Sequence, residues 1–264
     1  MSRISSYFQA LQGKKALIPF MTAGDPEPAM TVSLMHGLVD GGADIIELGV
    51  PFSDPMADGP IIQRASERAL RHNVTLSDVL MMVQRFRQDN KVTPIVLMGY
   101  LNPFAHMGYT EFAKRAAEAG VDGVLTVDCP PEASSDWLDA LNAVDIAPIF
   151  LVAPTTSDAR VAKIARYAKG YLYYVSLKGV TGADHLDLEQ VTRRVAALRS
   201  LISIPIAVGF GVRDAATARA LSSVADAVIV GSRLVQEIET APSEDVKEAV
   251  TRLVAELKMA IRSF

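Results

Sequence analysis

Eight short apolar segments, each rich in β-forming residues, recur along this chain of 264 residues and alternate with stretches patterned like amphipathic helices. The eight segments are Ala16–Met21, Asp44–Leu48, Pro94–Gly99, Gly123–Val127, Ala147–Val152, Tyr171–Val175, Pro205–Val208 and Ala227–Val230. Strands that alternate with helices form parallel sheets, and eight such units close on themselves. The pattern therefore predicts an α/β fold, a (β/α)8 TIM barrel.

The stretches between these segments carry the apolar spacing and the end signals of helices. The clearest are Pro28–Val39, Leu76–Phe86, Tyr109–Ala119, Ser157–Ala168 and Leu188–Leu198. An extra amphipathic stretch, Ile4–Leu11, precedes the first strand and is expected to cap the barrel. Because no linker or low-complexity tract interrupts the pattern, we expect residues 1–264 to form one domain.

A doubly wound open sheet is the competing architecture for alternating strands and helices. A dinucleotide-binding sheet of that kind needs a G-x-G-x-x-G turn after its first strand. This chain has Met21-Thr-Ala-Gly-Asp-Pro26 there instead, so the barrel is favoured.

Composition excludes several classes of function. The formal net charge is −4 and no basic run occurs, which argues against nucleic acid as a partner. No apolar stretch resembles a signal peptide or a membrane span, and the one cysteine, Cys129, cannot form an internal disulfide. We expect a soluble cytoplasmic protein that does not bind membranes.

A glutamate, Glu47, lies inside the otherwise apolar second strand segment. Side chains alternate between the two faces of a strand, so Glu47 points away from the side that Ile46 and Leu48 present to the outer helices. In the barrel mouth, burial would disfavour the charged carboxylate and raise its pKa, which suits proton transfer near neutral pH. A structural carboxylate paired with a barrel Lys or Arg explains the spacing equally well.

The segment that follows, Val50–Asn73, is longer than a minimal strand-to-helix connection, and we interpret it as a functional loop at the carboxyl end of a strand. It carries two further carboxylates, Asp54 and Asp58, in a backbone restricted by Pro51, Pro55 and Pro60. Asp58 is a second catalytic candidate, although an Asp before Gly more often only forms a turn.

Glycines follow the sixth, seventh and eighth strand segments, in Gly179-Val-Thr-Gly182, Gly209-Phe-Gly211 and Gly231-Ser232. Glycine lets backbone N–H groups approach an anion closely, and the stretch after Gly231-Ser232 is patterned as a short helix whose N-terminus favours negative charge. Loops after strands seven and eight often bind phosphate in these barrels, so the pattern favours a phosphate site.

Other catalytic chemistries find less support. The four histidines show no metal-ligand spacing: His36, His72, His106 and His185. Cys129 has no histidine nearby in sequence and is interpreted as a passive small residue. Lys178, near the end of the sixth strand, could form a Schiff base with a carbonyl substrate, although its place beside a glycine-rich loop favours a solvated or phosphate-facing lysine.

Five motifs occur in order along the whole chain. They are Pro19-Phe-Met-Thr-Ala-Gly-Asp-Pro26, Glu47-Leu-Gly-Val-Pro-Phe-Ser-Asp-Pro-Met-Ala-Asp-Gly-Pro60, Met98-Gly-Tyr-Leu-Asn-Pro103, Gly179-Val-Thr-Gly182 and Gly209-Phe-Gly-Val212. Together they resemble the motifs of tryptophan synthase α subunits. The long motif that holds Glu47 and Asp58 is highly specific, whereas the glycine motifs alone would be weak.

The resemblance implies that Glu47 is the general acid and base and that Asp58 is the second catalytic carboxylate. It implies that Gly182, Gly211, Gly231 and Ser232 surround the substrate phosphate. It also implies that the following residues surround the indole or a moving loop: Phe20, Ile62, Met98, Tyr100, Leu125, Tyr173, Thr181 and Phe210. One departure is Leu177, where some family members carry an arginine, so that arginine's role cannot be carried over.

The reaction that the resemblance implies is the retro-aldol cleavage of indole-3-glycerol phosphate to indole and glyceraldehyde 3-phosphate, without a cofactor or metal. Family members work with a pyridoxal-phosphate β subunit in an α2β2 heterotetramer. The resemblance places Asp54, Asn102, Asp128 and Pro130 near that partner. Independently of the resemblance, the long segment Ser176–Asp187 follows the sixth strand, and the backbone freedom that Gly179 and Gly182 provide makes it a candidate lid, with Thr181 as the contact that reports its closure.

Two other functions stay open at this point. One is a different phosphosugar barrel, such as a Schiff-base aldolase that uses Lys178. The other is a sensor of phosphorylated ligands that keeps the glycine loops but has no turnover.

Overall fold

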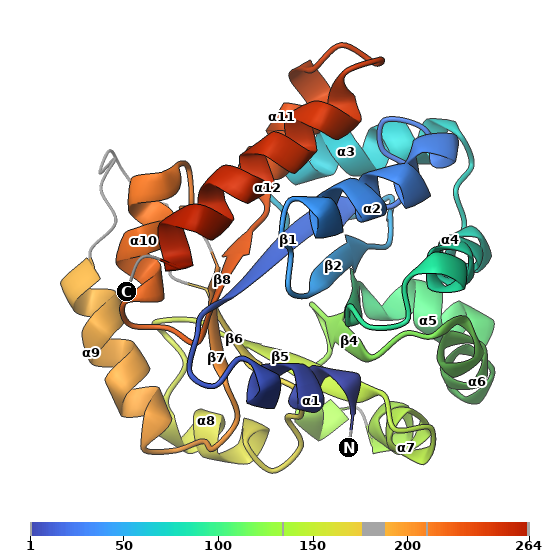
Figure 1. Ribbon diagram of the computed structural model, residues 1–264. Helices are drawn as coiled ribbons and strands as arrows, with labels where there is room; N and C mark the ends of the chain where they lie inside the picture. Colours follow the sequence, from blue (N-terminus) through green and yellow to red (C-terminus); the bar gives the residue numbers. More distant parts are fainter. Residues whose placement is uncertain (1, 134, 176–187, 210, 263–264) are drawn as a thin grey trace.

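Eight parallel strands form a closed barrel in chain order in the computed structural model, which describes residues 2–133, 135–175, 188–209 and 211–262 (Figure 1). The strands are β1 (Ala16–Thr22), β2 (Ile46–Gly49), β3 (Ile95–Gly99), β4 (Gly123–Thr126), β5 (Ala147–Val152), β6 (Leu172–Val175), β7 (Ile206–Gly209) and β8 (Ala227–Val230). The predicted fold class, a (β/α)8 barrel, is confirmed.

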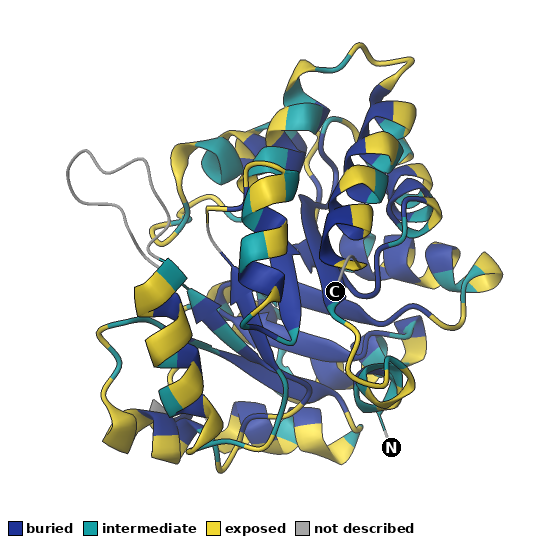
Figure 2. Ribbon diagram, turned by 60° about the vertical axis from the view of Figure 1, so that its left-hand side comes forward, coloured by how far each residue is buried: buried dark blue, intermediate teal, exposed yellow. Residues whose placement is uncertain are grey.

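Helices surround this barrel and bury their inner faces against it (Figure 2). In chain order they are α1 (Arg3–Ala10), η1 (Pro28–Met30), α2 (Thr31–Asp40), α3 (Pro60–Arg71), α4 (Leu76–Asp89), α5 (Leu101–Met107), α6 (Tyr109–Ala119), η2 (Pro131–Ala133), α7 (Ser135–Ala143), α8 (Asp158–Ile164), α9 (Leu188–Arg199), α10 (Ala215–Ser222), α11 (Ser232–Thr240) and α12 (Val246–Arg262). Figure 2 shows the strands almost wholly buried and the outer helix faces exposed, as a barrel core requires.

Two boundaries differ from the sequence pattern. Asp44 precedes β2 instead of belonging to it, because its carboxylate accepts a hydrogen bond from the Leu17 amide at 2.6 Å. The segment Val50–Asn73 is not all loop, since helix α3 occupies its second half. Proline at the first turn of α3 is compatible with a helix start, so the extended part ends at Gly59.

Helix α1 closes the amino-terminal end of the barrel, as expected for the extra N-terminal helix. Ile4 is fully buried and packs within the cluster of side chains that fills the barrel interior. A Cβ added at Gly123 or Gly170 would come within 3.1 and 3.4 Å of the Ile4 side chain. The carboxyl-terminal end of the barrel is therefore the end left for a ligand.

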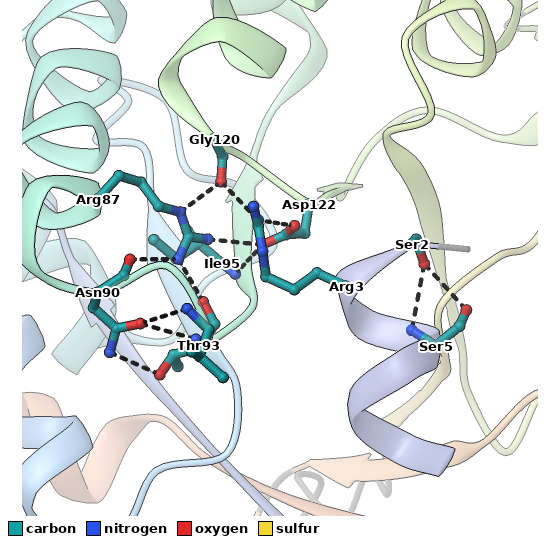
Figure 3. A network of polar contacts seen from close by, with 10 residues as sticks. Ser2, Arg3, Ser5, Arg87, Asn90, Thr93, Ile95, Gly120 and Asp122 are labelled. Carbon is teal, nitrogen blue, oxygen red and sulfur yellow. Dashed lines mark hydrogen bonds and ion pairs between the residues drawn. The ribbon is translucent and has the colours of Figure 1, made fainter. Parts of the chain in front are cut away.

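A polar network fixes α1 and α4 to the same amino-terminal end (Figure 3). Asp122, which precedes β4, accepts hydrogen bonds from the Ile95 amide and from Arg87, both at 2.8 Å, and pairs with Arg3 of α1. Arg87 also donates to the carbonyl of Gly120 at 2.9 Å. The Asp122 carboxylate is largely buried, and these partners offset the free-energy cost of burying its charge.

Asp44 is a second buried carboxylate with several polar partners at the amino-terminal end of the barrel. Besides the Leu17 amide, its carboxylate accepts a hydrogen bond from the Tyr7 hydroxyl at 2.9 Å and pairs with Lys258. Lys258 belongs to α12 and Tyr7 to α1, so one buried carboxylate joins the first and last helices to the barrel.

Candidate active site

A pocket opens at the carboxyl-terminal end of the barrel, between the ends of β1 to β4 and the start of α3. Its wall is formed by Phe20, Thr22, Gly49, Val50, Asp58, Ile62, Ser66, Met98, Gly99, Tyr100 and Val127. Most of these residues have no polar side-chain group, so the pocket suits a largely apolar ligand that presents few polar atoms.

Glu47 lies next to this pocket on β2, in register with Phe20 of β1. Its side chain is fully buried inside the barrel, as the alternation along the strand predicts. One carboxyl oxygen accepts a hydrogen bond of 2.5 Å from the Tyr171 hydroxyl, whereas Oε2 has no hydrogen-bond partner among the described residues. Burial raises the pKa of Glu47 to about 7, and the bond from Tyr171 opposes part of that rise.

Asp58 forms part of the pocket wall itself and is held by Tyr100. The Tyr100 hydroxyl donates to Asp58 at 3.1 Å and accepts from the Ala57 amide at 2.9 Å. Burial raises the pKa of Asp58, and the hydrogen bond from Tyr100 lowers it. The turn at Asp58 is further tied to α3, because Gln63 donates to the Asp58 carbonyl at 2.8 Å.

Tyr173 of β6 lies within electrostatic reach of both carboxylates. Burial first, and then the negative charges of Glu47 and Asp58, raise the pKa of its hydroxyl well above the usual range. A Cβ at Gly209 would meet the Tyr173 hydroxyl at 2.2 Å. Gly209, which the sequence analysis assigned to a phosphate-binding motif, is thus required for the packing of Tyr173.

Five of the residues that the family resemblance assigned to the site line the pocket: Phe20, Asp58, Ile62, Met98 and Tyr100. Leu125 is fully buried in the interior cluster, against which Met98 and Tyr173 pack. The fold thus brings together side chains from β1, β3, β4 and β6, from helix α3, and from the segments that follow β2 and β3. Lys178, Leu177, Thr181, Gly182, Phe210 and the expected lid Ser176–Asp187 lie outside the described residues.

Two of the expected phosphate residues lie beside this pocket. Gly231 and Ser232 form the start of α11, which begins with no side-chain cap, and a Cβ at Gly231 would lie 3.9 Å from Phe20. An uncapped helix start is suited to an anion. Gly211 has a φ of +79° and open space where a side chain would stand.

Sequence reasoning missed several residues at the site. Tyr171 is the main one, since nothing in its own segment indicates that its hydroxyl reaches a carboxyl 124 positions away. Thr22 could have been found, because it stands two residues after Phe20 and so faces the same side of β1.

The residues expected near a partner subunit follow the ends of β2, β3 and β4 on the same end of the barrel. Asp128 accepts a hydrogen bond from the Leu101 amide at 2.7 Å, and Asp54 accepts one from Ser53 at 2.6 Å. Met56 stands 85% exposed between Asp54 and Asp58. In the described ranges no cluster of side chains could hold a metal ion, and no helix there is long and apolar enough to cross a membrane.

Comparison with known proteins agrees with this geometry. Residues 8–262 match the family model described as "Tryptophan synthase alpha chain". A protein of that name from Chromobacterium violaceum is 70% identical over 262 residues, which cover 99% of this chain and all of the relative. Another from Nitrosospira multiformis is 61% identical over 263 residues, covering 99% of this chain and 94% of the relative.

Solved structures agree as well. The crystal structure of tryptophan synthase subunit alpha from Legionella pneumophila covers both chains fully, with a TM-score of 0.94 and 44% identity. A structure of tryptophan synthase from M. tuberculosis matches with a TM-score of 0.89 and 34% identity, over 99% of this chain and all of the other. The sequence motifs, the barrel and the full-length matches together show that this chain belongs to the tryptophan synthase alpha chain family.

Proposed function

We propose that the chain cleaves indole-3-glycerol phosphate to indole and glyceraldehyde 3-phosphate, the α reaction of tryptophan synthase. The observation that carries this function is the environment of Glu47. A fully buried carboxyl with a pKa of about 7 lies beside an apolar pocket that holds a second carboxylate, and one of its oxygens has no partner in the part of the chain that the structure describes. Such a group can both give and take a proton near neutral pH.

Glu47 supplies the two proton transfers of the cleavage. As a neutral acid it protonates C3 of the indole ring, which gives an indolenine with a C=N bond. Its carboxylate then removes the proton of the glycerol hydroxyl on the carbon attached to C3. The oxygen forms a carbonyl, the carbon–carbon bond breaks, and the electron pair of that bond returns to the ring. The products are indole and an aldehyde, and Glu47 ends protonated as it began.

Asp58 stabilises the positive charge that develops on the ring nitrogen in this reaction. It needs to be ionised to do so, and the hydrogen bond from Tyr100 favours its ionised form against the effect of burial. Phe20, Ile62 and Met98 provide the apolar walls for the ring. This division of roles is consistent with a fully buried Glu47 and an Asp58 on the pocket wall.

The phosphate of the substrate binds at the start of α11. Gly211, Gly231 and Ser232 would contribute backbone N–H groups there, and the dipole of α11 adds positive potential at its first turn. Gly182, which lies outside the described residues, is a further proposed contact.

The family works with a β subunit, and we propose that this chain forms an α2β2 heterotetramer with its own. Asp54, Asn102, Asp128 and Pro130 would lie near that partner. The exposed Met56 in the same loop adds an apolar side chain to this surface. Two further properties are predicted from the sequence alone: the chain forms a single domain, and it is located in the cytoplasm.

An assay with indole-3-glycerol phosphate tests the function directly. Release of indole by the purified chain, abolished in Glu47→Gln, is the expected result. Inactivation by borohydride in the presence of substrate would instead indicate a Schiff base on Lys178. Binding of the substrate without any release of indole would indicate a sensor.

A further inference from the structure

Thr22, the last residue of β1, carries a buried hydroxyl that no other described residue satisfies. The residue is 1% exposed, and within residues 2–133, 135–175, 188–209 and 211–262 its hydroxyl has no hydrogen-bond partner. In the described part of the chain only two other buried side-chain atoms are in this position, Oε2 of Glu47 and Nε of Arg194. Buried hydroxyls are normally paired, so an orphaned one in a pocket wall points to a ligand.

The register of the barrel places Thr22 on the strand next to that of the proposed acid, two residues nearer the mouth. Phe20 pairs with Glu47 across β1 and β2, and Thr22 pairs with Gly49 one step nearer the mouth. Thr22, Gly49 and Asp58 all belong to the wall of the same pocket. Gly49 has no side chain that could serve as a partner for Thr22.

The other two hydroxyl groups of the pocket wall, on Tyr100 and Ser66, differ from that of Thr22 in the hydrogen-bond partners that the protein offers them. The Tyr100 hydroxyl both accepts from the Ala57 amide and donates to Asp58. Ser66 lies inside α3, where a serine hydroxyl can return to the carbonyl one turn earlier. Thr22 stands at a strand end, where the backbone offers no such local acceptor, so its hydroxyl is the one that depends on the ligand.

The ligand's chemistry decides which of its atoms the hydroxyl meets. An indole ring has a single polar group, its N–H, which is a hydrogen-bond donor. Resting on the proposed function, we infer that Thr22 is a further substrate-binding residue whose hydroxyl accepts the hydrogen bond of the ring N–H beside Asp58. Thr22 thereby orients the nitrogen edge of the ring toward Asp58 and leaves C3 facing Glu47.

Inhibition constants of indole and of indene, which has carbon in place of the N–H, test this inference in assays of indole-3-glycerol phosphate cleavage. The unmodified chain should bind indole more tightly than indene. Thr22→Val, which keeps the shape and removes the hydroxyl, should weaken indole about fivefold to tenfold and leave indene unchanged. Thr22→Ser, which keeps the hydroxyl, should retain the preference for indole.

The thermal midpoint separates binding from structure. Because the hydroxyl has no partner in the described part of the protein, Thr22→Val should keep or raise the wild-type Tm. Equal inhibition by indole and indene in the unmodified chain, or an unchanged indole constant in Thr22→Val, would overturn the inference. Either result can occur in a chain that cleaves the substrate, so it would leave the proposed function standing. Absence of cleavage by the unmodified chain would overturn both.

Discussion

The two carboxyl oxygens of Glu47 have different surroundings, and this difference suits proton transfer. One oxygen is anchored by Tyr171, which fixes the orientation of the side chain. The other oxygen is buried, has no partner within the described ranges, and is the atom that we propose meets the substrate. An unsatisfied buried oxygen costs about 1–3 kcal/mol, so the fold gives up stability at the position where the chemistry is proposed.

Replacing Glu47 by Gln should remove nearly all turnover, because the amide keeps the shape but cannot exchange a proton. General acid–base catalysis typically contributes about 10²–10⁴-fold, so the variant should retain well under a hundredth of wild-type kcat. Steady-state kinetics with indole-3-glycerol phosphate provide the measurement. Retention of more than about a tenth of kcat would rule out the acid and base role.

Stability should also depend on pH through Glu47. Its pKa is about 7 in the folded protein and near its ordinary value of 4.5 in the unfolded chain. Between these values the folded state holds a proton that the unfolded state has lost, so the free energy of unfolding falls as pH rises through this window. The loss amounts to about 3 kcal/mol, at ~1.4 kcal/mol per pKa unit.

Glu47→Gln has no carboxyl at this position that could titrate. Urea unfolding at several pH values therefore compares the pH dependence of the free energy of unfolding in this variant and in the wild type. The stability of the variant should rise relative to that of the wild type by about 3 kcal/mol over the same window. Parallel stability curves would show that Glu47 is not held neutral by burial.

Tyr171→Phe should shift the pH dependence of the reaction. The Tyr171 hydroxyl lowers the pKa of Glu47, so its removal should raise that pKa and move the corresponding limb of the kcat profile to higher pH. Tyr174→Phe is a matched control on the other face of β6, where the side chain is 1% exposed. A shift of the same size in both variants would argue against a specific effect on Glu47.

Gly211 should matter for phosphate more than for indole. Gly211→Val should raise KM for indole-3-glycerol phosphate severalfold while leaving the inhibition constant of indole nearly unchanged, since close backbone approach to an anion favours glycine. The substitution also strains a backbone with φ of +79°. Gly13 is a control, because it has a φ of +86° and equally open space but is not a proposed phosphate contact. Gly13→Val therefore introduces the same kind of backbone strain away from the proposed phosphate site. Equal KM values in the two variants would make the role of Gly211 structural.

At the scale of elements, α3 is the helix that connects the site to the rest of the barrel. It begins just after Asp58, and its Arg68 pairs with the fully buried Asp25 at 2.6 Å and with Glu239 of α11 at 2.8 Å. The helix that follows one proposed catalytic residue is thus fixed to the helix whose start is proposed to bind phosphate.

Arg68→Met should destabilise the protein by about 3–5 kcal/mol, because it leaves the buried Asp25 without its partner. Arg64→Met provides the control, since Arg64 is half exposed and its one ion pair within the described residues is with Glu239. The unfolding midpoint of that variant should stay near the wild-type value. Chemical denaturation of both variants measures the difference, and similar midpoints for the two would show that Asp25 does not need Arg68.

The strands were predicted from the sequence, whereas α3 was interpreted as part of a loop. Each strand is buried on both faces and therefore appears as an apolar run. Helix α3 has a clear amphipathic pattern, in which Ile61, Ile62 and Ala65 pack against the barrel, but it begins directly at Pro60. Three prolines in the segment after β2 favoured a loop there and concealed the start of the helix.

At the scale of the whole molecule, alternation along one strand was enough to point Glu47 inward. It could not identify Tyr171, because many inward side chains could meet at the barrel axis and only the register between strands decides which do. Asp58 needed the family motif, since a carboxylate before a glycine carries no signal of its own. Closure of the sheet into a barrel brings residues that are distant in sequence together in one site.

The bond between Asp44 and the last helix has a consequence for how the chain matures during synthesis. Asp44 leaves the ribosome early, whereas its partner Lys258 emerges 214 residues later. At about 5–20 residues per second, the nascent barrel spends roughly ten seconds or more with this carboxylate lacking its cation. Premature termination shortly before α12 should therefore yield a chain with an uncompensated buried charge, a natural target for cellular quality control.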